Sequence, residues 1–268
     1  MEDRKLKIGF TCTNDGVLAA KKSGSNSIGD WVCLTSFPEN FYKLTGDRII
    51  DVDKTWVFDS NPYVNREDTA EQIIDTKPAW FRYGRNSPVM MSFADSLMSL
   101  LGTDKLPWLR HPKFYRYEDE ELIPTRIIFH PEGAQNKSTP RVLKYSTIQY
   151  ILEKYKKFDI CHVGGKDDAS IGHGVHDCRG MDLWEVVKMT SKAAIFIGID
   201  SGPYHIAQAF PRINRKLIIT EGQFKTDWPR DSYILDPKRD VTYWYDWDTM
   251  FFNEFGIDVG ITTSYLKI

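Results

Sequence analysis

The sequence has few cysteines, no long apolar run and no excess of either charge. Its four cysteines, Cys12, Cys33, Cys161 and Cys178, include no CxxC pair, which favours reduced thiols over a disulfide framework or a zinc knuckle. No apolar stretch approaches the roughly 18 to 20 residues that span a bilayer. Because 35 Lys and Arg balance 37 Asp and Glu, the net charge of −2 argues against bulk-charge binding to nucleic acid or membrane, although it leaves a local patch open.

Three functional signatures are also missing. The first residues, MEDRKLKIGF, have neither the basic region nor the long apolar core of a secretory signal, so we expect a cytoplasmic protein. No GxGxxG follows the first predicted strand, which disfavours a Rossmann dehydrogenase. GxSxG is absent and no cysteine has an evident histidine partner, which disfavours serine or cysteine hydrolase chemistry.

The composition that is present indicates a globular protein. Of the 268 residues, 41% are hydrophobic and 27% are charged, which excludes disorder as the main state. In the N-terminal part we expect a strand over residues 5–12, a mobile loop over 14–27, a helix from residue 31 that Pro38 kinks or ends, and a strand over 48–53. A further helix over residues 88–102 would have Gly102 as its C-cap.

The second half of the chain alternates strands and helices. An acidic run over residues 118–121, followed by Pro124, predicts a linker, and we place the domain boundary between residues 123 and 124. Beyond it, strands are expected over 125–130, 159–165 and 193–199, and helices over 142–155, 181–192 and 202–210. This alternation predicts an α/β domain with a parallel sheet and helices on both faces.

The strongest local signal is IFIGIDSGPYHIAQAF. An apolar strand ends, the turn Asp200-Ser201-Gly202 follows, and His205 lies on the first turn of a helix. Such a turn directs backbone N–H groups and the positive end of the helix dipole at one point, which favours a phosphate. The alternative is that Asp200 or Ser201 only caps the helix.

The segment FHPEGAQNKSTPRV also follows a strand, where ligands of open parallel sheets bind. Gly133 would let the backbone approach a ligand, and Lys137 would place a point charge on a diphosphate. The alternative for Lys137 is a solvated loop lysine. A third strand closes with Gly164 and Gly165, which is a weak signal without context.

Together these segments resemble the ADP-heptose heptosyltransferases of glycosyltransferase family 9. The resemblance covers residues 126–210: a strand ending in HP before Gly and KxxP, a strand ending in GG, a Met-Asp-Leu helix start, and IGxDSGPxHIAxA. It implies an α/β GT-B fold, in which two Rossmann-like domains with parallel sheets face each other across a cleft and the C-terminal domain holds the nucleotide-sugar donor. The implied domains are residues 1–123 and 124–242, and an aromatic-rich tail, 243–268, that packs back on the first domain.

The resemblance also implies roles for individual residues. Donor diphosphate contacts map onto Lys137, Asp200, Ser201, Gly202 and His205. Nucleotide contacts are assigned to Gly133, Gly164, Gly165 and Met181, the last of these near the base. The expected reaction is an inverting transfer in which the nucleotide-sugar is a substrate and neither a metal nor a cofactor is needed.

Asp30 is the expected catalytic base. The family's first strand-to-helix turn contains a Gly-Asp whose Asp takes the acceptor proton, and Gly29-Asp30 offers this pair, although an insert between Cys12 and Ile28 departs from the family. Lys137 and the helix after Asp200 would then stabilise the departing diphosphate. The alternative for Asp30 is an N-cap, and the alternative for the protein is a non-catalytic nucleotide-sugar binder.

Two further clusters of residues lie outside these motifs. His173, His176 and Cys178 lack a second ligand pair elsewhere, so we expect a polar loop and not a metal site. Basic residues alternate with aromatics between Trp80 and Tyr117, which suits an anionic acceptor with flat rings, either a lipopolysaccharide core or DNA with a flipped hydroxymethylated base. The alternative is an aromatic core with a solvated rim. The predicted acceptor-binding residues are Arg82, Arg85, Arg110, Lys113 and Arg116.

Overall fold

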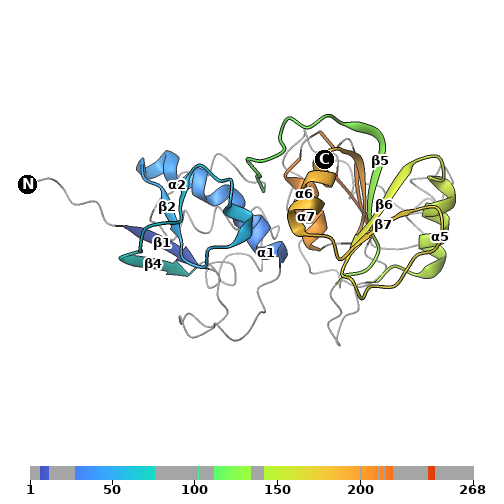
Figure 1. Cartoon of the computed structure of the whole chain (residues 1–268), viewed down its shortest axis with the longest axis horizontal. Helices are drawn as coiled ribbons and strands as arrows, with labels where there is room; N and C mark the ends of the chain where they lie inside the picture. Colours follow the sequence, from blue (N-terminus) through green and yellow to red (C-terminus); the bar gives the residue numbers. More distant parts are fainter. Residues whose placement is uncertain are drawn as a thin grey trace, which may run out of the picture. The chain divides into compact units, whose positions relative to one another are not determined.

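The computed structural model of the chain describes residues 7–11, 28–75, 102, 112–133, 142–199, 201–210, 212–213, 215–219 and 241–244. The chain divides into two compact units between Arg116 and Tyr117, a few residues before the boundary expected from the acidic run. Each unit is built on a parallel sheet with helices, which confirms the predicted α/β class (Figure 1).

The first unit contains a four-stranded parallel sheet in the order β3-β2-β1-β4. Its strands are β1 (Ile8–Thr11), β2 (Ile49–Asp51), β3 (Val64–Asn65) and β4 (Gln72–Asp75). The single helix expected from residue 31 is divided into α1 (Ile28–Cys33), a 3-10 turn η1 (Leu34–Ser36) and α2 (Phe37–Thr45), and a second 3-10 turn, η2 (Trp56–Phe58), follows β2. Pro38 lies in the first turn of α2, where its missing N–H has no helical partner, so the predicted break is confirmed.

Both faces of this sheet are covered. Phe10 of β1 is fully buried and meets Phe37 and Phe58 edge to face, at ring-centroid distances of 5.7 and 5.2 Å. These contacts pack the helical segment on one face. On the other face, a Cβ added to Gly9 would lie 2.5 Å from Cβ of Ala70, so only a glycine leaves room for the segment that precedes β4.

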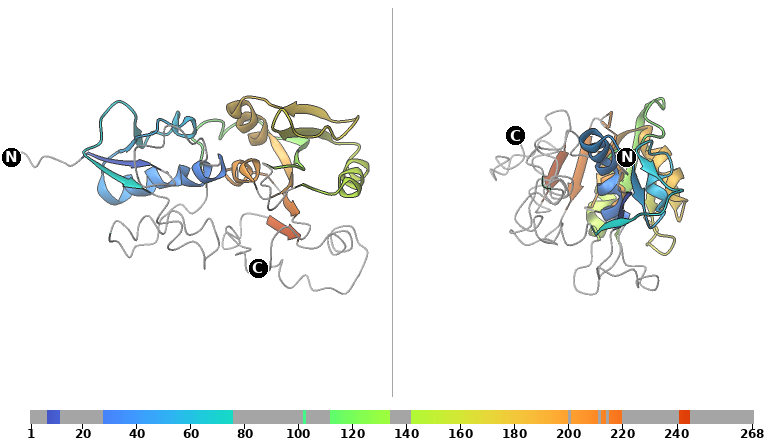
Figure 2. Two further views of the ribbon diagram at one scale, coloured as in Figure 1. Left: turned by 90° about the horizontal axis from the view of Figure 1, so that it is seen from below. Right: turned by 90° about the vertical axis from the view of Figure 1, so that its left-hand side faces the viewer.

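The second unit contains a six-stranded parallel sheet in the order β10-β9-β8-β5-β6-β7. The strands are β5 (Ile123–His130), β6 (Asp159–Gly164), β7 (His176–Arg179), β8 (Ala193–Gly198), β9 (Arg215–Ile219) and β10 (Val241–Trp244). From β5 the chain adds β6 and β7 on one side, then returns to add β8, β9 and β10 on the other; β10 lies beside β9 (Figure 2). This is the order of a doubly wound dinucleotide-binding sheet, and it reverses between β5 and β8.

Helices cover both faces of this second sheet. Figure 1 shows α5 (Tyr145–Lys154) on one side and α6 (Leu183–Ser191) with α7 (Gly202–Gln208) on the other. Asp182 starts α6 with a capping box, in which its carboxylate accepts from Trp184 N at 2.8 Å and Glu185 accepts from Asp182 N at 3.3 Å. The core beneath α5 consists of Ile127, Phe129, Leu143, Ile148, Ile151, Tyr155, Ile160, Ile171, Ile197 and Ile199.

Some expectations differ from the structure or lie outside it. The segment HDCR was expected to be a polar loop but forms β7, an edge strand in which His176 and Asp177 are exposed. Tyr243 and Trp244, the start of the expected tail, form the end of β10. The loop over 14–27, the helix over 88–101 and the tail after residue 244 lie outside the described residues, whereas Gly102 is described and has the left-handed φ of +73° that a C-cap needs.

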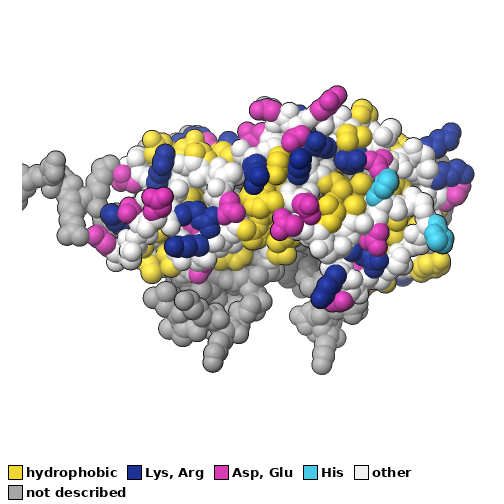
Figure 3. All heavy atoms as spheres, viewed as in Figure 1, with side chains coloured by type: hydrophobic (Ala, Val, Ile, Leu, Met, Phe, Trp, Pro, Cys, Tyr) yellow, Lys and Arg dark blue, Asp and Glu magenta, His cyan; other side chains and the backbone are white. Residues whose placement is uncertain are grey.

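The distribution of charged side chains on the surface agrees with the near balance of acidic and basic residues in the sequence. Acidic and basic side chains are interspersed over the face drawn in Figure 3. Within the residues that the structure describes, no helix has both the length and the apolar character to cross a bilayer.

Candidate functional site

Two of the predicted donor-binding segments meet at the carboxyl edge of the second sheet. β5 ends at His130, shortly before Gly133, and β8 ends at Gly198, shortly before Ser201. The register pairs His130 with Gly198, so these strand ends lie side by side. Because the strand order reverses between β5 and β8, this is the position where open α/β sheets bind ligands.

The side chain of Ser201, in the turn before α7, does not cap this helix. Ser201 occupies the N-cap position, but its hydroxyl donates to Ile199 O at 3.3 Å and makes no capping bond to α7. Gly202 begins the helix, and His205, 9% exposed, donates its backbone N–H to Ser201 O at 3.2 Å. Asp200 lies outside the described residues. The Ser201 side chain therefore does not use the N–H groups of the first turn.

The Gly-Gly turn after β6 has a local partner that the sequence did not reveal. Gly165 N donates to the carboxylate of Asp168 at 2.7 Å, and a Cβ on Gly164 would overlap this carboxylate. Burial raises the pKa of Asp168 above its ordinary value. Gly180 N donates to Gly164 O at 2.9 Å, which places the next residue, Met181, beside the turn.

The loop that contains Asp168 is attached to two other strand ends. Ala169 N donates to Glu132, just after β5, at 2.9 Å. The guanidinium of Arg179, at the end of β7, donates to Asp168 O and also makes two bonds, of 2.8 and 2.7 Å, to Asp177. These bonds from Arg179 hold the pKa of Asp177 well below its usual range. The carboxyl ends of β5, β6 and β7 are thus joined by polar contacts.

The segment that contains Lys137, the lysine predicted to bind the diphosphate, is flanked on both sides by described residues. Lys137 itself lies outside the described residues. Before it, Glu132 forms an antiparallel bridge with Val142, and Leu143 N donates to Pro131 O at 2.9 Å. Residues 131–132 and 142–143, which flank this segment, therefore lie together at the carboxyl end of β5. This is beside the switch point, the place between β5 and β8 where the strand order reverses.

The His/Cys segment does not form a metal cluster in the described residues. No group of three or more His, Cys, Asp or Glu side chains in that part of the chain is arranged to hold a metal ion. His176 Nε2 lies 3.1 Å from Asp159 Oδ1, across the β6–β7 pair. Burial raises the pKa of the Cys161 thiol, on β6, to about 12.

In the first unit, the expected base lies inside a helix. Asp30 is the third residue of α1 and its side chain is not among the described ones. It is therefore not the N-cap, although an acidic residue in the first turn still favours the helix dipole. At the carboxyl end of β1, Thr11 Oγ1 donates to Asp53 Oδ2 at 2.6 Å.

The described acceptor candidates have different surroundings. Lys113 Nζ lies 3.1 Å from Glu39 Oε2 and 4.5 Å from the ring centre of Tyr115, whereas Arg116 is exposed. The ammonium of Lys113 thus already has an acidic partner. The other three candidates lie outside the described residues: Arg82, Arg85 and Arg110.

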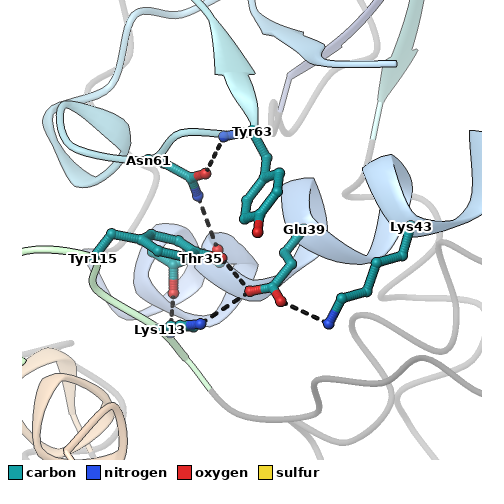
Figure 4. A network of polar contacts seen from close by, with 7 residues as sticks. All are labelled: Thr35, Glu39, Lys43, Asn61, Tyr63, Lys113 and Tyr115. Atoms are coloured by element: carbon teal, nitrogen blue, oxygen red, sulfur yellow. Dashed lines mark hydrogen bonds and ion pairs between the residues drawn. The ribbon is translucent and has the colours of Figure 1, made fainter. Parts of the chain in front are cut away.

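Glu39 is the centre of this network (Figure 4). Its carboxylate, 7% exposed, accepts from Lys43 at 2.7 Å, from Lys113 at 3.1 Å and from Tyr115 OH at 2.6 Å. Burial raises the pKa of Glu39, but the hydrogen bonds from Lys43, Tyr115 and Lys113 outweigh it, so the pKa lies below its ordinary value. Lys113 N also donates to Thr35 Oγ1 at 2.8 Å, so the segment Lys113–Tyr115 contacts both α2 and η1.

Three polar residues at the carboxyl edge of the second sheet were missed by sequence reasoning. They are His130, Glu132 and Asp168, which contact Val163, Ala169 and Gly165 respectively. A signal existed, because His130 belongs to the HP motif itself and Glu132 and Asp168 each stand within a few residues of a strand end that the sequence predicts. Its partners could not be read from spacing, since they come from neighbouring strands or from the return of a loop.

No protein-family model matches the sequence, and no curated protein is significantly similar to it. Solved structures are similar. A glycosyl transferase family 9 protein from Veillonella parvula DSM 2008 matches with a TM-score of 0.62 and 12% identity, over 96% of this chain and 91% of that one. The E. coli heptosyltransferase WaaC with ADP matches with a TM-score of 0.61 and 11% identity, over 93% and 97%.

A third similar structure is the bacterial iron-containing dodecameric glycosyltransferase TibC from enterotoxigenic E. coli, with a TM-score of 0.51 and 18% identity. The match covers 84% of this chain and 62% of that one. At such low identities the likeness concerns the fold. The resemblance to family 9 found in the motifs is thus confirmed for the fold.

Proposed function

We propose that the protein is an inverting, metal-independent glycosyltransferase that moves a sugar from a nucleoside-diphosphate donor to an acceptor hydroxyl. The observation that supports this most directly is the edge between β5 and β8, where the segments around Gly133, Ser201 and Gly202 follow adjacent strand ends. A switch point of this kind suits a nucleotide, and the fold is that of known glycosyltransferases.

The donor diphosphate is assigned to the β8–α7 turn and to Lys137. Ser201 and Gly202 stand at the start of α7, where backbone N–H groups have no helical partner, and the resemblance assigns Asp200 and His205 to the diphosphate as well. In the transition state, negative charge grows on the leaving diphosphate, so fixed donors and the Lys137 ammonium stabilise it more than the ground state. We assign the nucleoside to the turns at Gly133, at Gly164 and Gly165, and at Met181.

Asp30 is assigned as the general base. An attack by an acceptor hydroxyl on the anomeric carbon requires that its proton be removed as the bond forms, and a carboxylate performs this role. The departing diphosphate takes the bonding electrons of the broken glycosidic bond. The configuration inverts because a single displacement occurs on the face opposite the leaving group.

The donor nucleotide is best sought first among adenine nucleotides. WaaC was solved with ADP and with ADP-2-deoxy-2-fluoro heptose, and TibC with ADP-D-beta-D-heptose. The acceptor is proposed to be anionic, with the basic residues before residue 117 as its contacts. Lys113 is the weakest of these candidates, because Glu39 already neutralises it.

The test is a thermal-shift panel with ADP, GDP, UDP, CDP and dTDP on the wild type and on Lys137→Ala. A ligand that binds only the folded state stabilises it by mass action, by about 2.7 kcal/mol at a hundredfold excess over Kd. We expect one diphosphate to raise Tm in the wild type and to do so much less in Lys137→Ala. No response from any nucleotide in folded protein would contradict the proposal, and equal responses would remove Lys137 from the site.

Transfer itself is tested with the responding nucleotide's sugars and Asp30→Asn. Asparagine keeps the size of the side chain but does not take a proton, so donor Kd should stay within about threefold while the transfer rate falls by at least about a hundredfold. Activity should persist in EDTA. A fully active Asn variant would overturn the base, loss of activity in EDTA would overturn metal independence, and binding without any transfer or hydrolysis would favour the non-catalytic binder.

A further inference from the structure

A buried histidine ends the strand at the switch point. His130 follows three fully buried apolar residues of β5, Ile127, Ile128 and Phe129, and is itself 4% exposed. An apolar side chain would fill such a position without the cost of burying a polar ring. A buried polar group persists where it makes specific hydrogen bonds, so its partners indicate what it does.

The ring of His130 joins β5 to β6. Its Nδ1 lies 2.9 Å from Val163 O, in the neighbouring strand. Because a carbonyl oxygen only accepts, this contact assigns the hydrogen to Nδ1 and leaves Nε2 as the acceptor nitrogen of the neutral ring. Val163 is followed directly by Gly164 and Gly165, so the bond fixes the strand end from which the Gly-Gly turn starts.

The main chain of His130 joins β5 to β8 on the opposite side. His130 O accepts from Ile199 N at 3.2 Å, and the register pairs His130 with Gly198. A Cβ on Gly198 would lie 2.6 Å from His130 O and 3.2 Å from His130 Cβ. Such approaches would force the strands apart, so the glycine lets β8 lie close to His130 just before the turn at Ser201.

We propose that His130 is a positioning residue for the donor site, an inference that rests on the proposed function. It fixes the distance between the turn after β6 and the turn after β8, and the Pro131–Gly133 segment continues from its own backbone. A rigid nucleotide that contacts several turns at once binds well only if their spacing is correct, since a shift of about 1 Å breaks several contacts together.

Three variants separate this role from its alternatives. His130→Asn places an amide nitrogen near the position of Nδ1 and keeps the bond to Val163 O. His130→Gln places polar atoms near Nε2 instead. His130→Leu keeps an apolar volume and removes both nitrogens. Ile151→Val, on the buried face of α5 and outside the predicted site residues, is the control for a loss of stability alone.

The readouts are the Kd of the responding nucleoside diphosphate by calorimetry and the Tm without ligand, both on the full chain. We expect His130→Leu and His130→Gln to raise Kd by about tenfold or more, and His130→Asn to stay within about threefold of the wild type. Ile151→Val should lower Tm with Kd unchanged. A long-range ¹⁵N–¹H spectrum of the wild type should show His130 protonated at Nδ1.

The outcomes are distinct. If His130→Leu lowers Tm like the control and leaves Kd unchanged, the role is structural and the proposal is overturned. If Gln restores binding and Asn does not, Nε2 contacts the donor directly and positioning is overturned as well. Should the Leu variant fail to fold, the Asn and Gln pair still decides. A wild type that binds no nucleotide overturns the proposed function and, with it, this role; protonation at Nε2 overturns this role alone.

Discussion

At the scale of single residues, one buried carboxylate is expected to set part of the pH dependence of stability. Asp51 ends β2 and is 1% exposed. Its Oδ2 accepts from Thr55 N at 2.6 Å, and Arg66 Nη2 lies 4.0 Å away. Among the residues that the structure describes, its buried Oδ1 has no hydrogen-bond partner. Burial outweighs these contacts and raises the pKa of Asp51 from 3.8 to about 6.

The raised pKa predicts that Asp51→Asn is more stable than the wild type at neutral pH. The folded state holds this proton more tightly than the unfolded state, so its stabilising effect is complete below pH 3.8 and is lost as pH rises to about 6. The amide is always neutral and still accepts from Thr55. At pH 7.5 we expect a gain of about 1 to 3 kcal/mol in the free energy of unfolding, which vanishes near pH 4.

Urea titrations at pH 4 and pH 7.5 check this, with Glu67→Gln, at an exposed position, as the control. If Asp51→Asn is destabilised at pH 7.5, the Arg66 guanidinium stabilises the carboxylate more than burial penalises it. A gain that is the same at both pH values would show that the titration of Asp51 is not its cause.

Residue roles at the site were only partly readable from the sequence. The motif around Ser201 and Gly202 was placed correctly at a strand-to-helix turn, because the apolar run, the polar turn and the proline are local signals. The partner of the Gly-Gly turn was not predicted. The contact between Gly164 and Asp168 depends on the path of a loop, and residue spacing does not encode that path.

At the scale of elements, the Glu39 network attaches the segment before the unit boundary to α2. Glu39→Gln would replace a carboxylate that accepts from two lysines and one tyrosine by a neutral amide. Hydrogen bonds to buried charged groups are worth about 1.5 to 3 kcal/mol, and we expect a loss in this range in the free energy of unfolding. The pKa of Glu39 is lowered in the folded state, so its contribution is present above the ordinary value of 4.5 and is lost as pH falls through the folded pKa.

The matched control for this prediction is Lys43→Met, which removes one ion pair of a lysine that is 38% exposed. Exposed pairs contribute little, and its effect should stay below about 1 kcal/mol. Chemical denaturation at pH 7 and pH 3.5 measures both variants. Equal effects of the two substitutions, or a Glu39→Gln effect that is undiminished at pH 3.5, would contradict the prediction that the ionised carboxylate of Glu39 stabilises the fold.

Most elements of the second unit were predictable and the exceptions have physical reasons. Apolar runs such as AAIFIG and the capping residues Asp182 and Glu185 are local features, so β8 and α6 were found close to their observed bounds. β7 was missed because an edge strand buries one side poorly and needs no apolar pattern. The short strands β3 and β4 exist through pairing with neighbours, which is a tertiary effect.

At the scale of the whole molecule, the sequence predicted the alternation of strands and helices but not the strand order. The order places β5 beside β8, although β6 and β7 lie between them in the chain, and this adjacency brings together the strand ends that precede the predicted donor-binding segments. Right-handed crossovers restrict the topologies without selecting one. The proposed donor site thus depends on the strand order of the folded sheet, whereas its motifs are local features of the sequence.

This arrangement predicts where a nucleotide protects the full chain from hydrogen exchange. With the responding diphosphate at saturation, amides at the carboxyl ends of β5, β6 and β8 and in the first turn of α7 should exchange more slowly, because ligand binding suppresses their local opening. Amides of β1 to β4 should exchange at unchanged rates. Lys137→Ala at the same nucleotide concentration should lose most of the protection.

Mass spectrometry of peptides from both units measures the hydrogen exchange, and each unit serves as the reference for the other. Protection confined to β5, β6, β8 and α7 is the result expected of a donor site built by the second sheet alone. Protection that extends to β1 and α1 would contradict a donor site built by the second sheet alone, since it requires the nucleotide to contact or order the first unit.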